Sequence, residues 1–319
     1  MDRLELQKLI RGIIVATVTP FDDNFEVDYG RIYELAQWWV ENGLVEGKAV
    51  IKTCSVMGEM LSLADHEWPV VVRTVVQAVD GRVPVIGTIH GKDTKRSIDD
   101  ALRAQDLGAV GLQISAPTGT DPSQDDTLRY FSDMSDAIEI GMMIYNTPWM
   151  PHGGIETDTF HKMADFEHVV AIKWCDFPDY NYDDMAGLSD IFNICDNSNQ
   201  PGRCFRLGGK GFLDEQATAN PAHELKVLEL VETGKYEEAQ TLWDSVSVPI
   251  NRFYSKITEK SGGSSRVKKG VLALMGHPVG SARPPSQPLS GDEMAELRDI
   301  LVGLGWPVAE RAGRVGTIA

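Results

Sequence analysis

The chain of 319 residues is rich in acidic side chains, with 47 Asp and Glu against 30 Lys and Arg and a formal net charge of −17. This balance argues against a nucleic-acid partner, because affinity for a phosphate backbone comes from Lys and Arg that release counterions. No apolar stretch approaches the roughly 18 residues that a membrane-spanning helix needs, and the first residues carry no run typical of a signal peptide. We therefore expect a cytoplasmic protein with no membrane partner and a sizeable core.

The cysteines give no sign of a metal site or a disulfide framework. They are widely spaced and form neither a CxxC pair nor a zinc-ligand pattern, at Cys54, Cys175, Cys195 and Cys204. We expect them to be reduced thiols that pack as small buried hydrophobic side chains.

Short runs rich in Val and Ile alternate with longer segments of helical periodicity, which is typical of βαβ units around a parallel sheet. There are eight such runs, and eight parallel strands close a (β/α)8 TIM barrel. The predicted strands span residues 12–20, 48–53, 83–88, 110–115, 142–146, 169–173, 192–195 and 211–213.

Beyond residue 221 the strand signals stop and only helical stripes continue. The sequence therefore predicts a barrel domain over residues 1–221 and a C-terminal helical domain over residues 222–319. Pro249 is expected to kink the helix that carries the apolar side chains Trp243, Ile250 and Phe253, because proline removes a backbone donor and crowds the preceding turn. Residues 280–290 read as a proline-rich connection.

Reacting groups of such barrels lie at the carboxyl ends of the strands, and two side chains there can do imine chemistry. Lys173 ends an apolar strand, where burial would favour a free amine able to attack a carbonyl and form a Schiff base. Tyr145 ends the strand before it and could exchange protons beside a cationic iminium. Both positions also allow purely structural roles, with the amine of Lys173 reaching solvent or an acid and the ring of Tyr145 packing in the core.

Other strand ends carry weaker signals. The loop that contains Ser55, Val56 and Met57 could turn backbone amides toward a carboxylate. Lys52 precedes this loop and is the rival of Lys173 for the imine. Further candidates for contact with substrate, each of which could instead cap a loop, are Asn146, His90, Asp214 and the run Asp196-Asn197-Ser198-Asn199.

The order and spacing of several motifs from about residue 12 to 306 resemble the dihydrodipicolinate synthase and N-acetylneuraminate lyase family of class I, Schiff-base-forming aldolases. These motifs are Gly12-Ile-Ile-Val-Ala-Thr-Val-Thr-Pro-Phe21, Gly58-Glu59, Tyr145-Asn146-Thr147-Pro148, Ala171-Ile172-Lys173, Gly208-Gly209-Lys210-Gly211, Thr218-Ala219-Asn220-Pro221 and Ala282-Arg283-Pro284-Pro285. The resemblance implies a barrel with a C-terminal helical domain, assembled as a homotetramer or dimer. It also implies that Lys173 rather than Lys52 forms the imine and that Tyr145 moves protons.

The chain departs from the family pattern at its substrate-binding positions. Ser55-Val56-Met57-Gly58-Glu59 stands where the family has Gly-Thr-Thr-Gly-Glu, so both hydroxyls that help hold a 2-oxo acid carboxylate are missing. In the synthase an arginine binds the carboxylate of the aldehyde substrate; it would fall near Met150, where this chain has no arginine. The synthase's tyrosine pair after the fourth strand is also absent. Both departures argue against a role in lysine biosynthesis. Apolar side chains could line the pocket instead, namely Met57, Trp149, Met150 and Trp174, unless Trp174 points out of the barrel opposite Lys173.

We therefore expect a lyase that makes or breaks a carbon–carbon bond in a pyruvate-type 2-oxo acid. The resemblance to hydratase-aldolases favours an apolar or aromatic aldehyde as the second substrate. Neither a metal nor an organic cofactor is required, because the lysine imine is itself the electron sink. Two alternatives stay open: a 2-oxo acid dehydratase or deaminase that uses the same imine, and a non-catalytic binding homologue.

Overall fold

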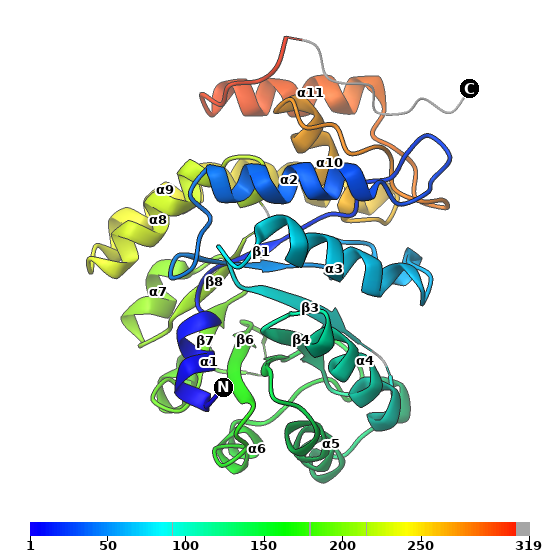
Figure 1. Cartoon of the computed structure of the whole chain (residues 1–319). Helices are drawn as coiled ribbons and strands as arrows, with labels where there is room; N and C mark the ends of the chain where they lie inside the picture. The colour runs from blue at the N-terminus through cyan, green and yellow to red at the C-terminus, as the bar shows by residue number, and fades with distance from the viewer. Residues whose placement is uncertain (91, 179, 215, 311–319) are drawn as a thin grey trace.

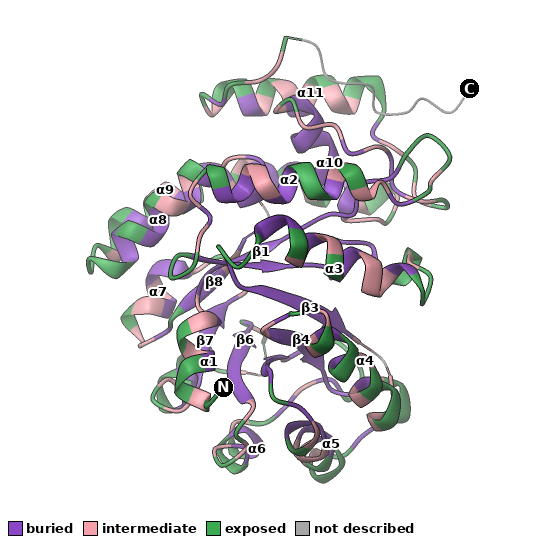
Figure 2. Ribbon diagram, viewed as in Figure 1, coloured by how far each residue is buried: buried purple, intermediate pink, exposed green. Residues whose placement is uncertain are grey.

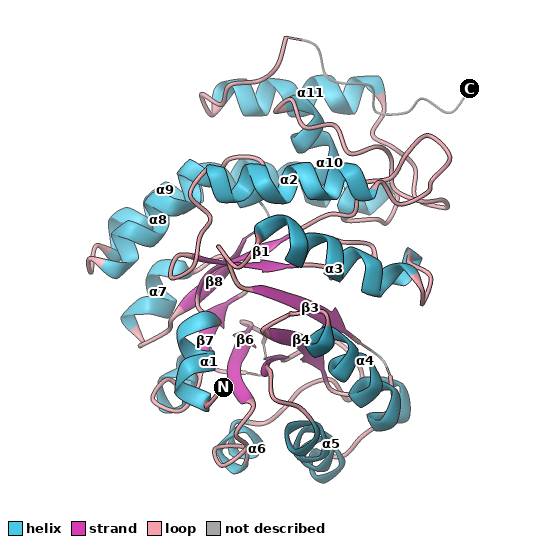
Figure 3. Cartoon of the chain, viewed as in Figure 1, coloured by secondary structure: helices cyan, strands magenta, loops and turns pink. Residues whose placement is uncertain are grey.

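The computed structural model describes residues 1–310 except residues 91, 179 and 215. Its centre is a closed barrel of eight parallel strands that pair in chain order, with β8 returning to β1 (Figures 1 and 3). The predicted (β/α)8 fold is confirmed. The strands are β1 Gly12–Ala16, β2 Ala49–Lys52, β3 Val85–Ile89, β4 Gly111–Ser115, β5 Gly141–Tyr145, β6 Val169–Trp174, β7 Asn193–Asp196 and β8 Gly211–Asp214.

Each strand is followed by a helical segment that covers the outside of the barrel (Figure 3). The covering segments are α2 Tyr29–Glu41, α3 Glu67–Val79, α4 Thr94–Asp106, α5 Gln124–Ala137, α6 Thr157–Lys162, the 3-10 helix η3 Tyr182–Leu188, α7 Pro201–Arg206 and α8 Pro221–Glu232. Shorter 3-10 turns occur at η1 Met60–Ser62, η2 Thr118–Thr120 and η4 Gln216–Thr218. None of the helices in the described part of the chain is both long and apolar enough to span a membrane.

The first strand is shorter than predicted. It ends at Ala16 rather than at residue 20, because the chain then leaves the sheet for the C-terminal segment, where the amide of Phe21 donates to the carbonyl oxygen of Val279 at 3.1 Å. Pro20 could not continue a central strand in any case, since it has no N–H to donate.

The barrel is filled by side chains arranged in layers of four, each layer drawn from alternate strands. The strand registers give a lower layer of Val50, Gly111, Ala171 and Gly211 and a middle layer of Ile14, Ile86, Met143 and Cys195. Helix α1, Arg3–Leu9, closes the amino-terminal end, with Leu6 and Ile10 packed against these layers. A Cβ atom on Gly141 would lie 2.7 Å from Cδ1 of Ile10, so a glycine is needed there.

The C-terminal helices extend the structure on one side of the barrel (Figure 1). They are α9 Tyr236–Lys260, α10 Ser265–Leu274 and α11 Gly291–Gly303. Helix α9 packs against α7 and α8, and α8 packs against β1, so contacts continue across residue 221. The domain boundary at that residue and the kink at Pro249, which lies inside α9, stay predictions. Residues 311–319 of the predicted second domain lie outside the described residues.

Burial separates the inner faces of these elements from their solvent faces (Figure 2). The large hydrophobic cluster between the strands and the covering helices includes Trp39, Phe131, Phe160 and Phe212, and it continues into α9 through Trp243 and Phe253. All four cysteines are buried free thiols, as predicted.

Truncation of Ile10 tests the layered core. Ile10→Ala should lower the free energy of unfolding by about 2–5 kcal/mol, because it leaves a cavity where Ile10 packs against the amino-terminal end of the barrel core. Leu4→Ala, on the same helix but 68% exposed, is the matched control and should change the value by less than about 0.5 kcal/mol. Urea unfolding of both variants measures the difference, and equal losses would contradict the layer assignment.

Candidate active site

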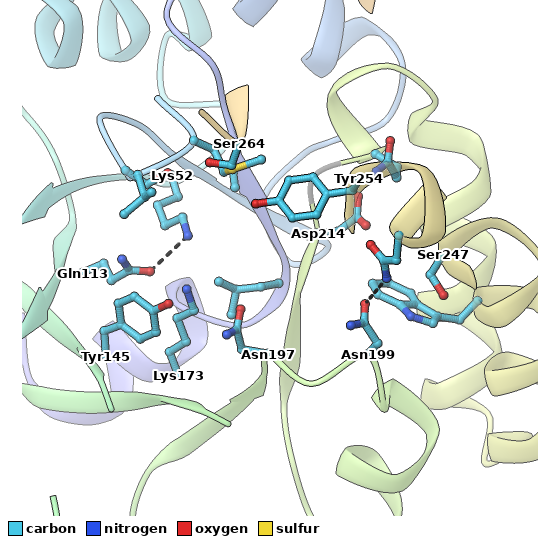
Figure 4. Close-up of a pocket in the computed structure, with 18 of the residues that line it drawn as sticks. Lys52, Gln113, Tyr145, Lys173, Asn197, Asn199, Asp214, Ser247, Tyr254 and Ser264 are labelled. Atoms are coloured by element: carbon cyan, nitrogen blue, oxygen red, sulfur yellow. Dashed lines mark hydrogen bonds between the residues drawn. The ribbon is translucent and has the colours of Figure 1, made fainter. Parts of the chain in front are cut away.

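The third interior layer differs from the two below it, because it is mostly polar. The registers place Lys52 of β2, Gln113 of β4, Lys173 of β6 and Leu213 of β8 in this layer. In most barrels of this kind, branched apolar side chains fill such positions. Here two buried lysines point into a cavity at the carboxyl ends of the strands (Figure 4). Lys52 is 2% exposed and Lys173 is 6% exposed.

Lys173 lies against the ring of Tyr145. The two residues are direct neighbours in the pairing of β5 with β6, and Nζ of Lys173 is 3.5 Å from the centre of the tyrosine ring. When this group is protonated, the ring face attracts the ammonium electrostatically, and the attraction grows when water is excluded. The strand pairing therefore holds the amine beside a side chain that can donate and accept protons.

Lys52 belongs to a chain of polar contacts on the opposite wall. Its Nζ donates to Oε1 of Gln113 at 3.0 Å. Nε2 of Gln113 lies 3.4 Å from Nε2 of His90, and Nδ1 of His90 lies 2.8 Å from Oγ of Ser115. Burial, reinforced by the positive charges of Lys173 and Lys52, lowers the pKa of His90 to about 3. His90 is therefore neutral at physiological pH.

The loop after β2 lies above the third layer. Cys54 and Glu59, at its two ends, have positive φ angles of 57° and 53°, a conformation that costs energy for residues other than glycine and is often found at functional sites. Among the described residues, the backbone amides of residues 55–58 donate no hydrogen bond, and Oγ of Ser55 is buried without a partner. The loop thus presents donors that a carboxylate could use.

A buried ion pair and a backbone hydrogen bond hold this loop against the C-terminal part of the chain. Glu59 pairs with Lys269 of α10 at 2.8 Å, with both side chains less than 10% exposed. The amide of Arg283 donates to the same carboxylate at 3.2 Å. The Arg283 guanidinium also binds both oxygens of Glu67, which lowers the pKa of that carboxyl. The Gly-Glu and Ala-Arg-Pro-Pro motifs are therefore joined in space through Glu59 and Arg283.

The cavity has a volume of about 410 Å³ and continues from the lysines toward α9 (Figure 4). Its far wall is polar, and two buried atoms there have no partner among the described residues, Nε1 of Trp243 and Oε1 of Gln216. Other contributions from this side are Asn197, Asn199, Ser247, Asn251, Tyr254 and Ser264. The wall offers hydrogen bonds to a substrate that reaches beyond the lysine end.

Asp196 shapes the loop that brings Asn197 and Asn199 to the cavity. Its carboxylate accepts hydrogen bonds from the hydroxyl of Tyr182 at 2.7 Å and from the amides of Ser198 and Gln200. Burial raises the pKa of Asp196 to about 6. Within this run, Asp196 is therefore a loop-capping residue, and the two asparagines face the cavity.

The structure brings together most of the predicted site residues. Those that line the cavity are Lys173, Tyr145, Ser55, Val56, Met57, Trp149 and Asp214. Trp149 also packs edge-on against Tyr145, with 5.6 Å between the ring centres. Asp214 is buried, and its carboxylate accepts a hydrogen bond from the amide of Ala217.

Three of the residues considered for the pocket lie elsewhere, and for Trp174 this is the outward alternative that strand alternation left open. The Asn146 side chain does not line the cavity; it exchanges hydrogen bonds with the backbone of Ile155, because the residue after an inward tyrosine faces outward. Trp174 likewise points away from Lys173, donating to the carbonyl oxygen of Tyr182 and packing near Phe160. Met150 is 41% exposed and lies outside the cavity lining.

Sequence reasoning missed the contribution of α9. Trp243, Ser247, Asn251 and Tyr254 follow one another at spacings of four, four and three residues, which is one stripe of a helix. The stripe contains both apolar and polar side chains. Because Trp243 was interpreted only as a core residue, the polar residues on the same face of the helix were not recognised as part of a site. Gln113 was also missed, although it is the one amide inside an otherwise apolar strand.

The described residues contain no group of three or more His, Cys, Asp or Glu side chains placed to hold a metal ion. The polar groups that the cavity does present are two amines, a phenol and the hydrogen-bonding groups around them.

Comparisons with known proteins find both similar sequences and similar folds. The sequence model of the Dihydrodipicolinate synthetase family matches residues 9–303. A 4-hydroxy-tetrahydrodipicolinate synthase from Staphylococcus carnosus (strain TM300) is 30% identical over 254 residues, which cover 77% of this chain and 85% of the relative. Another from Acetivibrio thermocellus is 27% identical over 308 residues, which cover 93% and 98%.

Solved structures share the same fold. The chloride-inhibited dihydrodipicolinate synthase of Acinetobacter baumannii, solved with pyruvate, superposes with a TM-score of 0.82 at 22% identity, covering 93% of this chain and 99% of that chain. The dihydrodipicolinate synthase of Aquifex aeolicus superposes with a TM-score of 0.79 at 23% identity, covering 94% and 99%.

Titration of His90 should appear in the pH dependence of stability. The folded state keeps His90 neutral down to about pH 3, whereas the unfolded chain binds a proton below the ordinary pKa of 6.5. The unfolded state therefore holds more protons between these values, and stability falls as the pH drops through this window. His90→Gln should flatten that slope by up to about 1.4 kcal/mol per pH unit.

Urea unfolding between pH 4.5 and 7.5 measures this slope. His66→Gln, at an exposed histidine, is the control and should keep the parent slope. A His90→Gln slope equal to that of the control would contradict a neutral, buried His90.

Proposed function

The chain belongs to the dihydrodipicolinate synthetase family, and from that premise we propose that it is a class I aldolase that forms an imine between Lys173 and a pyruvate-type 2-oxo acid. The observation that carries the proposal is the position of the Lys173 amine, buried at the end of β6 and 3.5 Å from the centre of the Tyr145 ring. A buried amine loses part of the hydration that stabilises its charged form, which favours a nucleophile.

In the proposed reaction, Nζ of Lys173 attacks the carbonyl carbon of the 2-oxo acid, and the carbonyl oxygen leaves as water. The resulting iminium withdraws electrons, so the adjacent carbon gives up a proton and becomes an enamine. That carbon then attacks the carbonyl carbon of an aldehyde, whose oxygen takes up a proton. Water adds to the iminium carbon, the bond to Nζ breaks, and the product leaves with the amine regenerated; the reverse sequence cleaves the same carbon–carbon bond. Tyr145 is the side chain that would carry these protons.

Substrate binding is proposed for the loop after β2 and for the wall beside it. The amides around Val56 and Met57, together with Ser55, would receive the carboxylate of the 2-oxo acid. Val56, Met57 and Trp149 are apolar residues of the cavity lining, which favours an aldehyde with an apolar or aromatic part. Asp214 would face the far end of that substrate.

A second candidate reaction is dehydration or deamination of a hydroxylated 2-oxo acid through the same imine. The polar wall formed by α9 favours it, because Trp243 and Gln216 keep unpartnered hydrogen-bonding atoms at the cavity. The products distinguish the two reactions, since cleavage gives two fragments and elimination keeps every carbon in one product.

The cavity lining argues against the 4-hydroxy-tetrahydrodipicolinate synthase activity for which the relatives are named. The family's substrate-binding arginine would fall near Met150, where this chain has none. Among the described residues that line the cavity there is also no arginine. A purely binding role is disfavoured because the chain keeps both Lys173 and Tyr145. A homotetramer or dimer is part of the proposal, on the strength of the family resemblance.

Reductive trapping tests the proposed imine. Incubation with pyruvate and borohydride should inactivate the protein and add one reduced pyruvate to the peptide that contains Lys173, because borohydride reduces the imine to a stable amine. Mass spectrometry of the digested protein measures the adduct, and Lys173→Ala should abolish it. An adduct on Lys52, or on no lysine, would contradict the proposal.

Exchange of pyruvate methyl protons tests the role of Tyr145 without knowledge of the aldehyde. In deuterated water the wild-type protein should exchange these protons through the enamine, as seen by proton NMR. Tyr145→Phe should slow exchange by about 10²–10⁴-fold, the usual range for a general acid or base, while trapping still labels Lys173. Tyr33→Phe, at an exposed tyrosine, is the matched control. Equal exchange rates in the two variants would contradict this role.

A further inference from the structure

We propose that Lys52 is the residue that binds the carboxylate of the 2-oxo acid and thereby selects charged over uncharged carbonyl substrates. The inference rests on the proposed imine at Lys173 and adds a specific role for the second amine. It starts from the third layer of the barrel, which brings these two side chains from opposite strands to one cavity.

The geometry directs both amines to the same point. Strands β2 and β6 are four strands apart in a barrel of eight, so they face each other across its axis. The interior of such a barrel is only wide enough for side chains to fill it, and Figure 4 shows the two amine ends turned toward one another at the cavity floor. A small molecule attached to Lys173 therefore has Lys52 on its other side.

The chemistry of a 2-oxo acid fits this arrangement. Its carboxylate is bonded directly to the carbon that forms the imine, so it cannot be far from Nζ of Lys173. The group that faces the imine from β2 is the amine of Lys52, and the loop with the free amides of residues 55–58 continues the same strand. An ammonium from below and amides from above would hold one carboxylate, as charge-assisted hydrogen bonds do in buried sites.

Neighbouring polar groups orient the ammonium of Lys52. Gln113 accepts a hydrogen bond from it at 3.0 Å. The next group in the chain is His90, which is neutral because burial and the two lysine charges lower its pKa to about 3. The Asp214 carboxylate in the same cavity lies on the α9 side in Figure 4, away from the line between the two lysines.

This role also accounts for the altered loop. Ser55-Val56-Met57 has one hydroxyl, that of Ser55, so the loop alone offers mostly backbone donors. A full positive charge from Lys52 supplies the attraction that those donors lack, and it favours a carboxylate over any neutral group of the same shape.

The test compares pyruvate with pyruvamide, which has the same shape and no charge. The rate of borohydride inactivation against the concentration of each compound gives its apparent affinity for Lys173. The wild-type protein should prefer pyruvate, and Lys52→Met should reduce this preference by about 10–100-fold, the range for a buried charged hydrogen bond. Lys52→Arg should restore part of the preference because it returns the charge. Lys48→Met, at an exposed lysine just before β2, is the matched control.

The outcomes separate this inference from the proposed function. If Lys52→Met keeps the wild-type preference and the adduct stays on Lys173, the role of Lys52 is wrong and the imine proposal stands. If pyruvate labels no lysine of the wild-type protein, both are wrong. If pyruvate labels Lys52 itself, Lys52 forms the imine and the carboxylate-binding role is overturned. Lys52→Gln, which keeps a donor for Gln113, replaces Lys52→Met if circular dichroism shows that the methionine variant is unfolded.

Discussion

The third interior layer of the barrel is the constraint on which the rest of the site depends. The two layers below it contain only apolar side chains, one thiol and glycines, and they close the barrel in the ordinary way. The third layer buries two amines, and removing an ammonium from water carries a large free-energy cost unless other groups compensate it. The ring of Tyr145 and the amide oxygen of Gln113 provide that compensation. The protein thus gives up packing stability in one layer to place two amines at the cavity, as expected of a functional site.

The remaining parts of the site can be understood as consequences of this layer. The carboxyl ends of the strands lie just above it, so the loop after β2 reaches the amines directly. That loop contains two residues with positive φ angles, and its end at Glu59 is fixed by Lys269 and Arg283 from the C-terminal part of the chain. Helix α9 then completes the far wall. The C-terminal helices therefore contribute to the site itself, both by holding a loop and by lining the cavity.

Much of this could be predicted from the sequence, and the failures have clear physical reasons. The strands were recognisable because buried parallel strands are continuous Val and Ile runs. The inward direction of Lys173 followed from alternation along β6. Alternation could not choose between Lys52 and Lys173, because both end apolar strands, and only the family resemblance favoured Lys173. The direction of the Asn146 side chain differs from that of Tyr145, because neighbouring residues in a strand face opposite sides. The wall from α9 could not be predicted, since it depends on how a distant helix docks on the barrel.

The most direct test of this account is a crystal structure of the protein soaked with pyruvate. The account predicts continuous electron density from Nζ of Lys173 to the second carbon of pyruvate, with the carboxylate between Lys52 and the amides of residues 55–58. Density joined to Lys52 would contradict the assignment of the imine. Pyruvate bound at the α9 wall without a covalent bond would contradict the claim that the third layer is the reactive centre.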